Sequence, residues 1–115
     1  MSVRRIVEYL DERGESPFGK WFVQLNPEAA AKVTIAMTRI EQRNFSNVSS
    51  VGRGAFEYKI HFGPGYRVYF AQDEIDLIIL LAGGTKKRQS EDIKLAQRRW
   101  ADYKIRKKGK GRLWH

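Results

Sequence analysis

The chain has 115 residues, of which 22 are Lys or Arg and 13 are Asp or Glu, so its formal net charge is +9. This length suits one domain with a hydrophobic core and leaves no room for two. The absence of cysteine excludes a disulfide framework and a thiolate metal site. No apolar segment has the length or the flanks of a signal peptide or a membrane span. We therefore expect a soluble, cytoplasmic domain that does not contact a membrane.

The excess positive charge is confined to the last quarter of the chain. Residues 1–85 hold 10 basic and 10 acidic side chains, whereas residues 86–115 hold 12 basic and 3 acidic side chains. This distribution predicts a basic face that attracts a polyanion, which could be nucleic acid, a ribosomal surface or an acidic protein segment. A solvated C-terminal tail would give the same count, so charge alone does not choose among these alternatives.

The first half of the chain predicts one strand followed by two helices. Residues 3–10 are β-branched and partly alternating, which favours a strand. Ser16-Pro17 and Asn26-Pro27 each place a capping side chain before a proline, and apolar residues at helical spacing follow each of them. We expect the second helix to run to about residue 44. The two helices should form a hairpin that covers one side of a sheet.

The second half begins with a predicted loop and three strands. Residues 45–54 are rich in Ser, Asn and Gly, which is typical of a loop. Apolar and polar residues alternate over residues 56–62 and again over residues 66–70, on either side of Gly63-Pro64-Gly65, and this predicts a β-hairpin. The aliphatic residues 75–82 predict a central strand buried on both faces, which we expect Gly83-Gly84-Thr85 to end.

A last helix is predicted from Ser90 onward, because Glu91 and Asp92 would lie near the positive end of its dipole. Its packing residues would be Ile93, Ala96, Trp100 and Tyr103. Glycines at 109 and 111 should loosen its end, so residues 1–108 would form the domain and residues 109–115 a basic tail. The order β-α-α-β-β-β-α predicts an α+β fold: a mainly antiparallel four-stranded sheet packed by a helical hairpin and a C-terminal helix.

Strand alternation also gathers polar side chains on one face of the predicted hairpin. If its aromatic residues point toward the helices, the opposite face carries Glu57, Lys59, His61, Arg67 and Tyr69. Residues 86–88, which are all basic, can overhang the same face. Such a surface offers cations for phosphate, a ring for stacking and groups for proton transfer. Each residue also has a purely structural interpretation, such as Glu57 pairing with Lys59 or Arg67.

Several other kinds of site do not fit the sequence. Residues 83–87 lack the spacing of a phosphate-binding P-loop, and residues 63–65 lack the dinucleotide-binding fingerprint. The two histidines are far apart in the chain, which argues against a zinc site. We expect neither a metal nor another cofactor, and metal-free chemistry on a polyanion remains.

The segment from Phe56 to Phe70 resembles the central hairpin of the RelE/ParE toxin superfamily. Within it, the segment is most similar to the HigB-like, phage Gp49-like branch of addiction module killer proteins. Residues 80–87, 90–93 and 100–103 fit that branch as well, so the resemblance covers nearly the whole chain.

This resemblance implies the toxin of a type II toxin–antitoxin system. Such toxins are ribosome-dependent mRNA interferases, metal-independent endoribonucleases that inhibit translation by cutting mRNA in the ribosomal A site. Carried over to this sequence, Arg67 would stabilise the scissile phosphate, Lys59 would position it or transfer a proton, and His61 would supply acid or base. Lys87 falls near the basic residue that follows the last strand, with Lys86 an equal candidate. The tyrosine that RelE carries in its last helix falls on Ile93.

The resemblance and the charge together predict an RNA-binding set and a set of partners. The RNA-binding residues would be Lys86, Arg88, Tyr69, Arg98, Arg99, Lys104, Arg106 and Lys107. The implied partners are a helix-turn-helix antitoxin, the ribosome and mRNA, with operator DNA reached through the antitoxin complex. Two alternatives stay open: a ParE-like inhibitor of DNA gyrase, which needs no catalytic residues, and a non-catalytic nucleic-acid-binding module.

Overall fold

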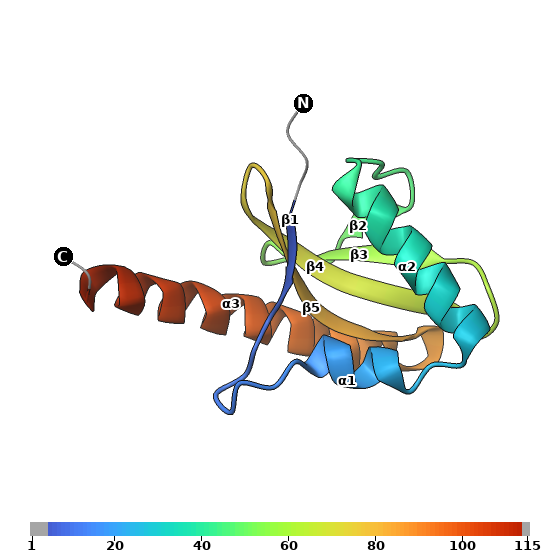
Figure 1. Ribbon diagram of the computed structural model, residues 1–115, viewed down its shortest axis with the longest axis horizontal. Coiled ribbons are helices and arrows are strands. Elements are labelled where there is room, and N and C mark those ends of the chain that lie inside the picture. The colour runs from blue at the N-terminus through green and yellow to red at the C-terminus, as the bar shows by residue number, and fades with distance from the viewer. Residues whose placement is uncertain (1–4, 114–115) are drawn as a thin grey trace.

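The computed structural model describes residues 5–113 of the chain, and the side chains of residues 5–109. Its elements are β1 (Arg5–Glu8), α1 (Pro17–Val23), α2 (Pro27–Glu41), β2 (Val48–Ser50), β3 (Phe56–Ile60), β4 (Tyr66–Glu74), β5 (Leu77–Thr85), a 3₁₀ turn (Lys86–Arg88) and α3 (Gln89–Leu113). Figure 1 shows how they are arranged. None of the helices in this part of the chain is both long and apolar enough to cross a membrane.

The five strands form one sheet in the order β1-β5-β4-β3-β2. Strand β1 runs parallel to β5, and every other pair is antiparallel. The predicted α+β fold is therefore confirmed, but the sheet has five strands and not four. The additional strand is β2, which lies at the edge within the segment that was expected to be a loop. It is only three residues long, so it leaves no detectable alternation in the sequence.

The two predicted helix caps are present. The Ser16 hydroxyl accepts a hydrogen bond from the Gly19 amide at 2.8 Å, and the Asn26 side chain accepts one from the Ala29 amide at 2.8 Å. Each cap satisfies an amide that has no partner inside the helix, and the proline that follows it removes another. Helix α2 ends at Glu41, a few residues before the expected end.

The sheet lies between two helical layers (Figure 1). Helices α1 and α2 cover one face, with a core that includes Phe18, Val33, Ile40, Tyr58, Ile60, Val68, Phe70 and Leu80. Helix α3 covers the other face, with a core that includes Tyr9, Tyr69, Ile79, Leu81, Ala96 and Trp100. The packing residues expected on α3 are confirmed. Because both faces are covered, strand alternation alone does not tell which side chains reach the solvent.

Strand β5 continues through the two glycines that were expected to end it. A Cβ added to Gly83 would lie 2.0 Å from the ring of Trp21 on α1, and one added to Gly84 would lie 2.0 Å from Asp92 Oδ2 on α3. The two glycines thus let a helix approach the strand closely on each face.

Helix α3 continues through Gly109 and Gly111 to Leu113, whereas these glycines were expected to loosen its end. The division into a domain of residues 1–108 and a basic tail stays a prediction, and residues 114–115 of that tail lie outside the described residues. The C-terminal part of the helix extends beyond the edge of the sheet (Figure 1).

Candidate active site

One buried carboxylate lies between two cations on the α3 face of the sheet. Lys59 on β3 and Arg67 on β4 are directly opposed in the antiparallel register, and Glu57 precedes Lys59 on the same face of β3. Glu57 Oε2 lies 3.3 Å from Arg67 Nε, and Glu57 Oε1 lies 3.9 Å from Lys59 Nζ. Two residues of the predicted catalytic set are therefore held together by a third residue outside that set.

The surroundings of Glu57 fix this arrangement. Gln89 at the start of α3 donates a hydrogen bond to Glu57 Oε2 at 2.7 Å. Arg67 Nη1 donates to the carbonyl of Gly65 at 3.1 Å, and the Lys86 amide donates to the same carbonyl at 2.8 Å. The guanidinium of Arg67 thus spans from the buried carboxylate to the hairpin turn, and the backbone of Lys86 is joined to that turn.

Glu57, Arg67, Tyr69 and Asp92 form what we call the buried polar cluster, since all four are less than a tenth exposed. It contains the buried side-chain polar atoms that have no hydrogen-bond partner among the described residues: Arg67 Nε, Tyr69 Oη and Asp92 Oδ2. Burial raises the pKa of Asp92, and burial together with the charge of Glu57 raises the pKa of Tyr69. Orphaned buried groups cost stability, and they gather at functional sites.

The polar face expected to be open is therefore largely closed. Glu57 is 1% exposed and Tyr69 is 0% exposed, because α3 packs over them. The prediction that Tyr69 contacts RNA is wrong for this reason: its ring lies in the core under α3. The side chain of Lys59, near the end of β3, is 40% exposed.

His61 lies just after the end of β3 and is exposed. It lines a shallow pocket of about 250 Å³ between α2 and β3, with Lys59 from β3 and Lys32 and Arg39 from α2. The structure therefore brings His61 together with Lys59. Lys87 is exposed on the 3₁₀ turn and makes no ion pair or side-chain hydrogen bond to any described residue.

Four residues of the predicted RNA-binding set form hydrogen bonds or ion pairs with other residues of the chain. Arg99 donates to the carbonyl of Leu81 at 2.9 Å, and burial lowers the pKa of Arg99. The other three form ion pairs with carboxylates: Arg88 with Glu91 at 2.9 Å, Arg106 with Asp102 at 2.6 Å, and Lys107 with Asp73 at 2.7 Å. Lys86, Arg98 and Lys104 are exposed and have no carboxylate partner among the described residues. The RNA contacts of all seven residues remain predictions.

Asp92 and Gln89 are the members of the site that sequence reasoning missed. Asp92 was interpreted only as a favourable charge at the helix N-terminus, and no pattern indicated its position behind Gly84. The two consecutive glycines at the end of an aliphatic strand were the available signal, since they permit a close approach from each face. Ile93, which the expected resemblance aligned with the RelE tyrosine, is partly buried and packs against the core under α3.

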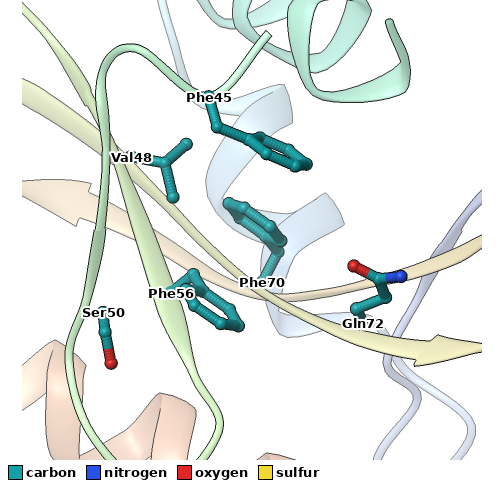
Figure 2. Close-up of a pocket in the computed structure, with 6 residues that line it drawn as sticks. All are labelled: Phe45, Val48, Ser50, Phe56, Phe70 and Gln72. Atoms are coloured by element: carbon teal, nitrogen blue, oxygen red, sulfur yellow. The ribbon is translucent and has the colours of Figure 1, made fainter. Parts of the chain in front are cut away.

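A separate apolar pocket of about 220 Å³ lies near the β2 edge of the sheet, lined by Phe45, Val48, Ser50, Phe56, Phe70 and Gln72 (Figure 2). The ring of Phe70 stacks between those of Phe45, at 6.4 Å, and Phe56, at 5.7 Å. No charged residue lines this pocket, so it offers none of the groups that the chemistry of a polyanion requires. Among the described residues, no three His, Asp or Glu side chains group closely enough to hold a metal ion.

Comparison with known proteins gives a family for most of this fold. Residues 20–101 match the family described as phage derived protein Gp49-like (DUF891). The chain is also 42% identical over 81 residues to an uncharacterized protein of Haemophilus influenzae, an alignment that covers 70% of this chain and 82% of that protein. The family match includes β3, β4, β5 and the first half of α3, and hence the whole buried polar cluster.

Proposed function

The chain belongs to the phage derived protein Gp49-like family, and from that premise we propose that it is the toxin of a type II toxin–antitoxin system. Its activity would be that of a ribosome-dependent endoribonuclease, which cuts mRNA and so inhibits translation in the cytoplasm. The resemblance of the Phe56–Phe70 hairpin to RelE/ParE toxins supports the class. The observation that carries the reaction is the opposed pair of Lys59 and Arg67, anchored on Glu57.

In the proposed reaction the 2′-hydroxyl of the RNA attacks the adjacent phosphorus, and the bond to the 5′-oxygen of the next nucleotide breaks. Negative charge grows on the phosphoryl oxygens in the transition state, and preorganised cations stabilise it. A guanidinium has five N–H donors. Because the contacts of Arg67 to Glu57 and Gly65 leave some of these donors over, Arg67 can bind the phosphate while it stays anchored.

Lys59 and His61 share the neighbouring pocket and supply the proton-transfer groups of the proposal. One would take the proton from the 2′-hydroxyl, and the other would return a proton to the departing 5′-oxygen. Lys86 and Lys87, which directly follow β5, would add positive charge near the hairpin turn. No cofactor takes part in this scheme.

The closed site supports the proposed dependence on the ribosome. The Arg67 side chain is only 8% exposed, so a freely diffusing RNA meets little of its guanidinium. A ribosome that holds the mRNA with the 2′-hydroxyl in line would supply the orientation that the protein lacks. The proposed partners are accordingly the ribosome with its mRNA, and a neutralising helix-turn-helix antitoxin through which the complex binds operator DNA.

The test is expression of Arg67→Ala and of Arg67→Lys, followed by growth curves and mapping of mRNA 5′ ends. Both variants should lose growth arrest and A-site cleavage by at least about 100-fold, since a lysine cannot reproduce the bidentate fork. Arg67→Lys keeps a positive charge beside Glu57, so we expect this variant to fold, and its loss of activity would not be a result of unfolding. Arg13→Ala, which changes an exposed loop cation, is the matched control.

Full toxicity of a folded Arg67→Lys protein would reject the catalytic assignment. A supercoiling assay on the wild-type protein separates the alternatives: inhibition of gyrase without mRNA cleavage would reassign it as a ParE-like inhibitor. RNA binding with neither effect would reassign it as a binding module.

A further inference from the structure

A basic groove runs along α3, distinct from the pocket of Lys59 and His61. It is lined by Arg53, Lys94, Gln97, Arg98, Ala101 and Lys104, and we call it the α3 groove. Arg53 comes from the loop between β2 and β3, and the other five residues lie on one side of the helix. Four of the lining side chains are cations, and none is an acid.

The cations of the α3 groove are among those that form no ion pair with any described residue. Among the described residues, no carboxylate lies within ion-pairing distance of Arg53, Lys94 or Arg98. Lys104 lies over the ring of Trp100 at 5.1 Å, a contact that leaves its charge uncompensated. On other sides of the same helix, by contrast, Arg106 and Lys107 are paired with acids. The groove therefore concentrates unneutralised charge.

The backbone at Arg53, whose side chain lines this groove, has a left-handed conformation. Arg53 has a φ of 55° between Gly52 at 88° and Gly54 at 85°, so three consecutive residues are left-handed. This conformation costs a residue other than glycine about 1–2 kcal/mol. The loop is nevertheless fixed, because Gln97 Nε2 donates to the carbonyl of Val51 at 2.7 Å. A strained residue held rigidly against a charged helix indicates a functional requirement for its side chain.

The geometry of the cations favours a linear partner. Lys94 and Arg98 are one helical turn apart, about 6 Å along the axis, and Lys104 lies about 15 Å from Lys94. An acidic protein segment would need apolar anchors for a stable interface, and Ala101 is the only apolar residue in the lining. Interfaces with nucleic acid are more polar and far more positive than interfaces between proteins. Guanidinium groups such as those of Arg53 and Arg98 suit phosphate in particular.

We propose that the α3 groove binds the phosphodiester backbone of RNA, with Arg53, Lys94, Arg98 and Lys104 as its phosphate ligands. The inference rests on the proposed function and extends it, since it places a docking site for RNA on α3, the helix whose first residue, Gln89, contacts Glu57. In this arrangement the RNA is held along α3 at the groove, while Arg67 and Lys59 act at the end of the sheet where α3 begins.

The first experiment measures the anisotropy of a fluorescein-labelled oligouridylate titrated with Lys94→Gln/Arg98→Gln at several salt concentrations. The double variant should bind at least about 10-fold more weakly at low salt than the wild type. The slope of log affinity against log salt should fall in magnitude by about 1.4, since each contact to a single strand contributes about 0.7. Arg5→Gln/Arg13→Gln removes two exposed cations elsewhere that form no ion pair with any described residue, and it should change neither quantity appreciably.

The second experiment uses Arg53→Gly, which removes the guanidinium and relieves the left-handed backbone. This variant should be at least as stable as the wild type to urea but should bind the oligouridylate several-fold more weakly. Unchanged binding by a stable Arg53→Gly protein would overturn the role of Arg53.

Polyglutamate of matched charge, carrying the same fluorophore, separates the two classes of partner. Binding of polyglutamate as tight as that of the oligouridylate, and weakened by the same variants, would overturn the proposal in favour of an acidic protein segment. These outcomes are independent of the proposed function. Groove variants that bind RNA normally would reject the groove even where Arg67→Lys abolishes cleavage. A groove that binds RNA in a protein that cleaves no mRNA would reject the function alone.

Discussion

The two faces of the sheet differ in what they bury. Beneath α1 and α2 the core is almost entirely apolar, with residues such as Val33, Ile40 and Leu80 fully or nearly fully buried. Beneath α3 an apolar part around Ile79 and Leu81 adjoins the buried polar cluster of Glu57, Arg67, Tyr69 and Asp92.

This difference supports the proposal that the reacting groups lie on the α3 face. Polar atoms without partners lower stability, and a face needed only for packing gains nothing from them. The α1 and α2 face supplies the stability that lets the α3 face retain such groups. The predictions that follow compare the two faces, from the largest expected effect to the smallest.

Loss of the charge on Glu57 should have the largest effect. Glu57→Ala leaves the guanidinium of Arg67 buried without a counter-charge, and removing one partner of a buried ion pair costs about 3–5 kcal/mol. Urea unfolding measures the loss. The double variant Glu57→Leu/Arg67→Met should recover most of it, because apolar side chains of similar volume pack without desolvated charge. A loss below about 1 kcal/mol for Glu57→Ala would mean that the pair is better solvated than its burial indicates.

Substitution of the two adjacent glycines compares the faces at neighbouring positions. Gly83→Ala would drive its Cβ into the rigid ring of Trp21 on α1, and we expect it to lower the free energy of unfolding by about 3 kcal/mol. Gly84→Ala meets the end of the Asp92 side chain, which can rotate away, so we expect a loss of about 1 kcal/mol. Equal losses in thermal or urea unfolding would contradict the difference in rigidity between the two faces.

Removal of the Tyr69 hydroxyl should be nearly neutral. Among the described residues its oxygen has no hydrogen-bond partner of good geometry, and the nearby charge of Glu57 only adds to its raised pKa, so Tyr69→Phe should leave stability unchanged or raise it by up to about 1 kcal/mol. The matched control is Tyr9→Phe, because the Tyr9 hydroxyl donates to Asp102 at 2.7 Å, and its loss should cost about 1.5 kcal/mol. A destabilised Tyr69→Phe would show that the hydroxyl has a partner, such as a buried water molecule.

The smallest effect concerns the pH dependence of stability. Desolvation raises the pKa of Asp92 in the folded protein, so its carboxylate weakens the fold above that pKa and ceases to do so as the pH falls through it. Asp92→Asn should therefore be more stable than the wild type at pH 7, by up to about 1 kcal/mol. The difference should shrink on acidification, which urea unfolding at a series of pH values would follow.

Asp73 provides the opposite case. Partial desolvation raises the pKa of Asp73, but the hydrogen bonds from Lys107 and Tyr103 outweigh it, so the net shift is downward. Burial is the main cause, and the hydrogen bond to Asp73 the next, of the rise in the pKa of Tyr103 to about 12. Asp73→Asn should accordingly destabilise the protein at neutral pH, and this loss should vanish as the pH falls through the lowered pKa of Asp73. If Asp92→Asn and Asp73→Asn changed the free energy of unfolding in the same direction at pH 7, the opposite pKa shifts of the two carboxyl groups would be contradicted.

Much of the fold could be predicted because local signals were strong. Ser16 and Asn26 before prolines determine the helix starts through hydrogen bonds inside one turn. Alternation over β3 and β4 correctly assigned Tyr58 and Val68 to one face and Glu57 to the other. The three-residue strand β2 was missed because its pairing depends on β3 rather than on its own residues.

The candidate site was predicted in part. Lys59 and Arg67 are opposed as expected, because residues of one parity in a hairpin share a face. Tyr69 was wrongly expected at the surface, since no local pattern shows where a helix that follows in the chain will pack. Arg53 was missed altogether, because its importance lies in a left-handed loop conformation that the sequence signals only through the glycines on either side.

The sequence by itself determined the types of the helices and of the strands other than β2, the hairpin and the location of the excess charge, since each depends on neighbours along the chain. Only the tertiary structure decided which cations are free. It pairs Arg106 and Lys107 with acids, encloses Arg67 beside Glu57 and leaves the α3 groove uncompensated. The physical reason is that the interaction of a charged side chain with a ligand depends on its burial and on neighbouring charges that are distant in sequence.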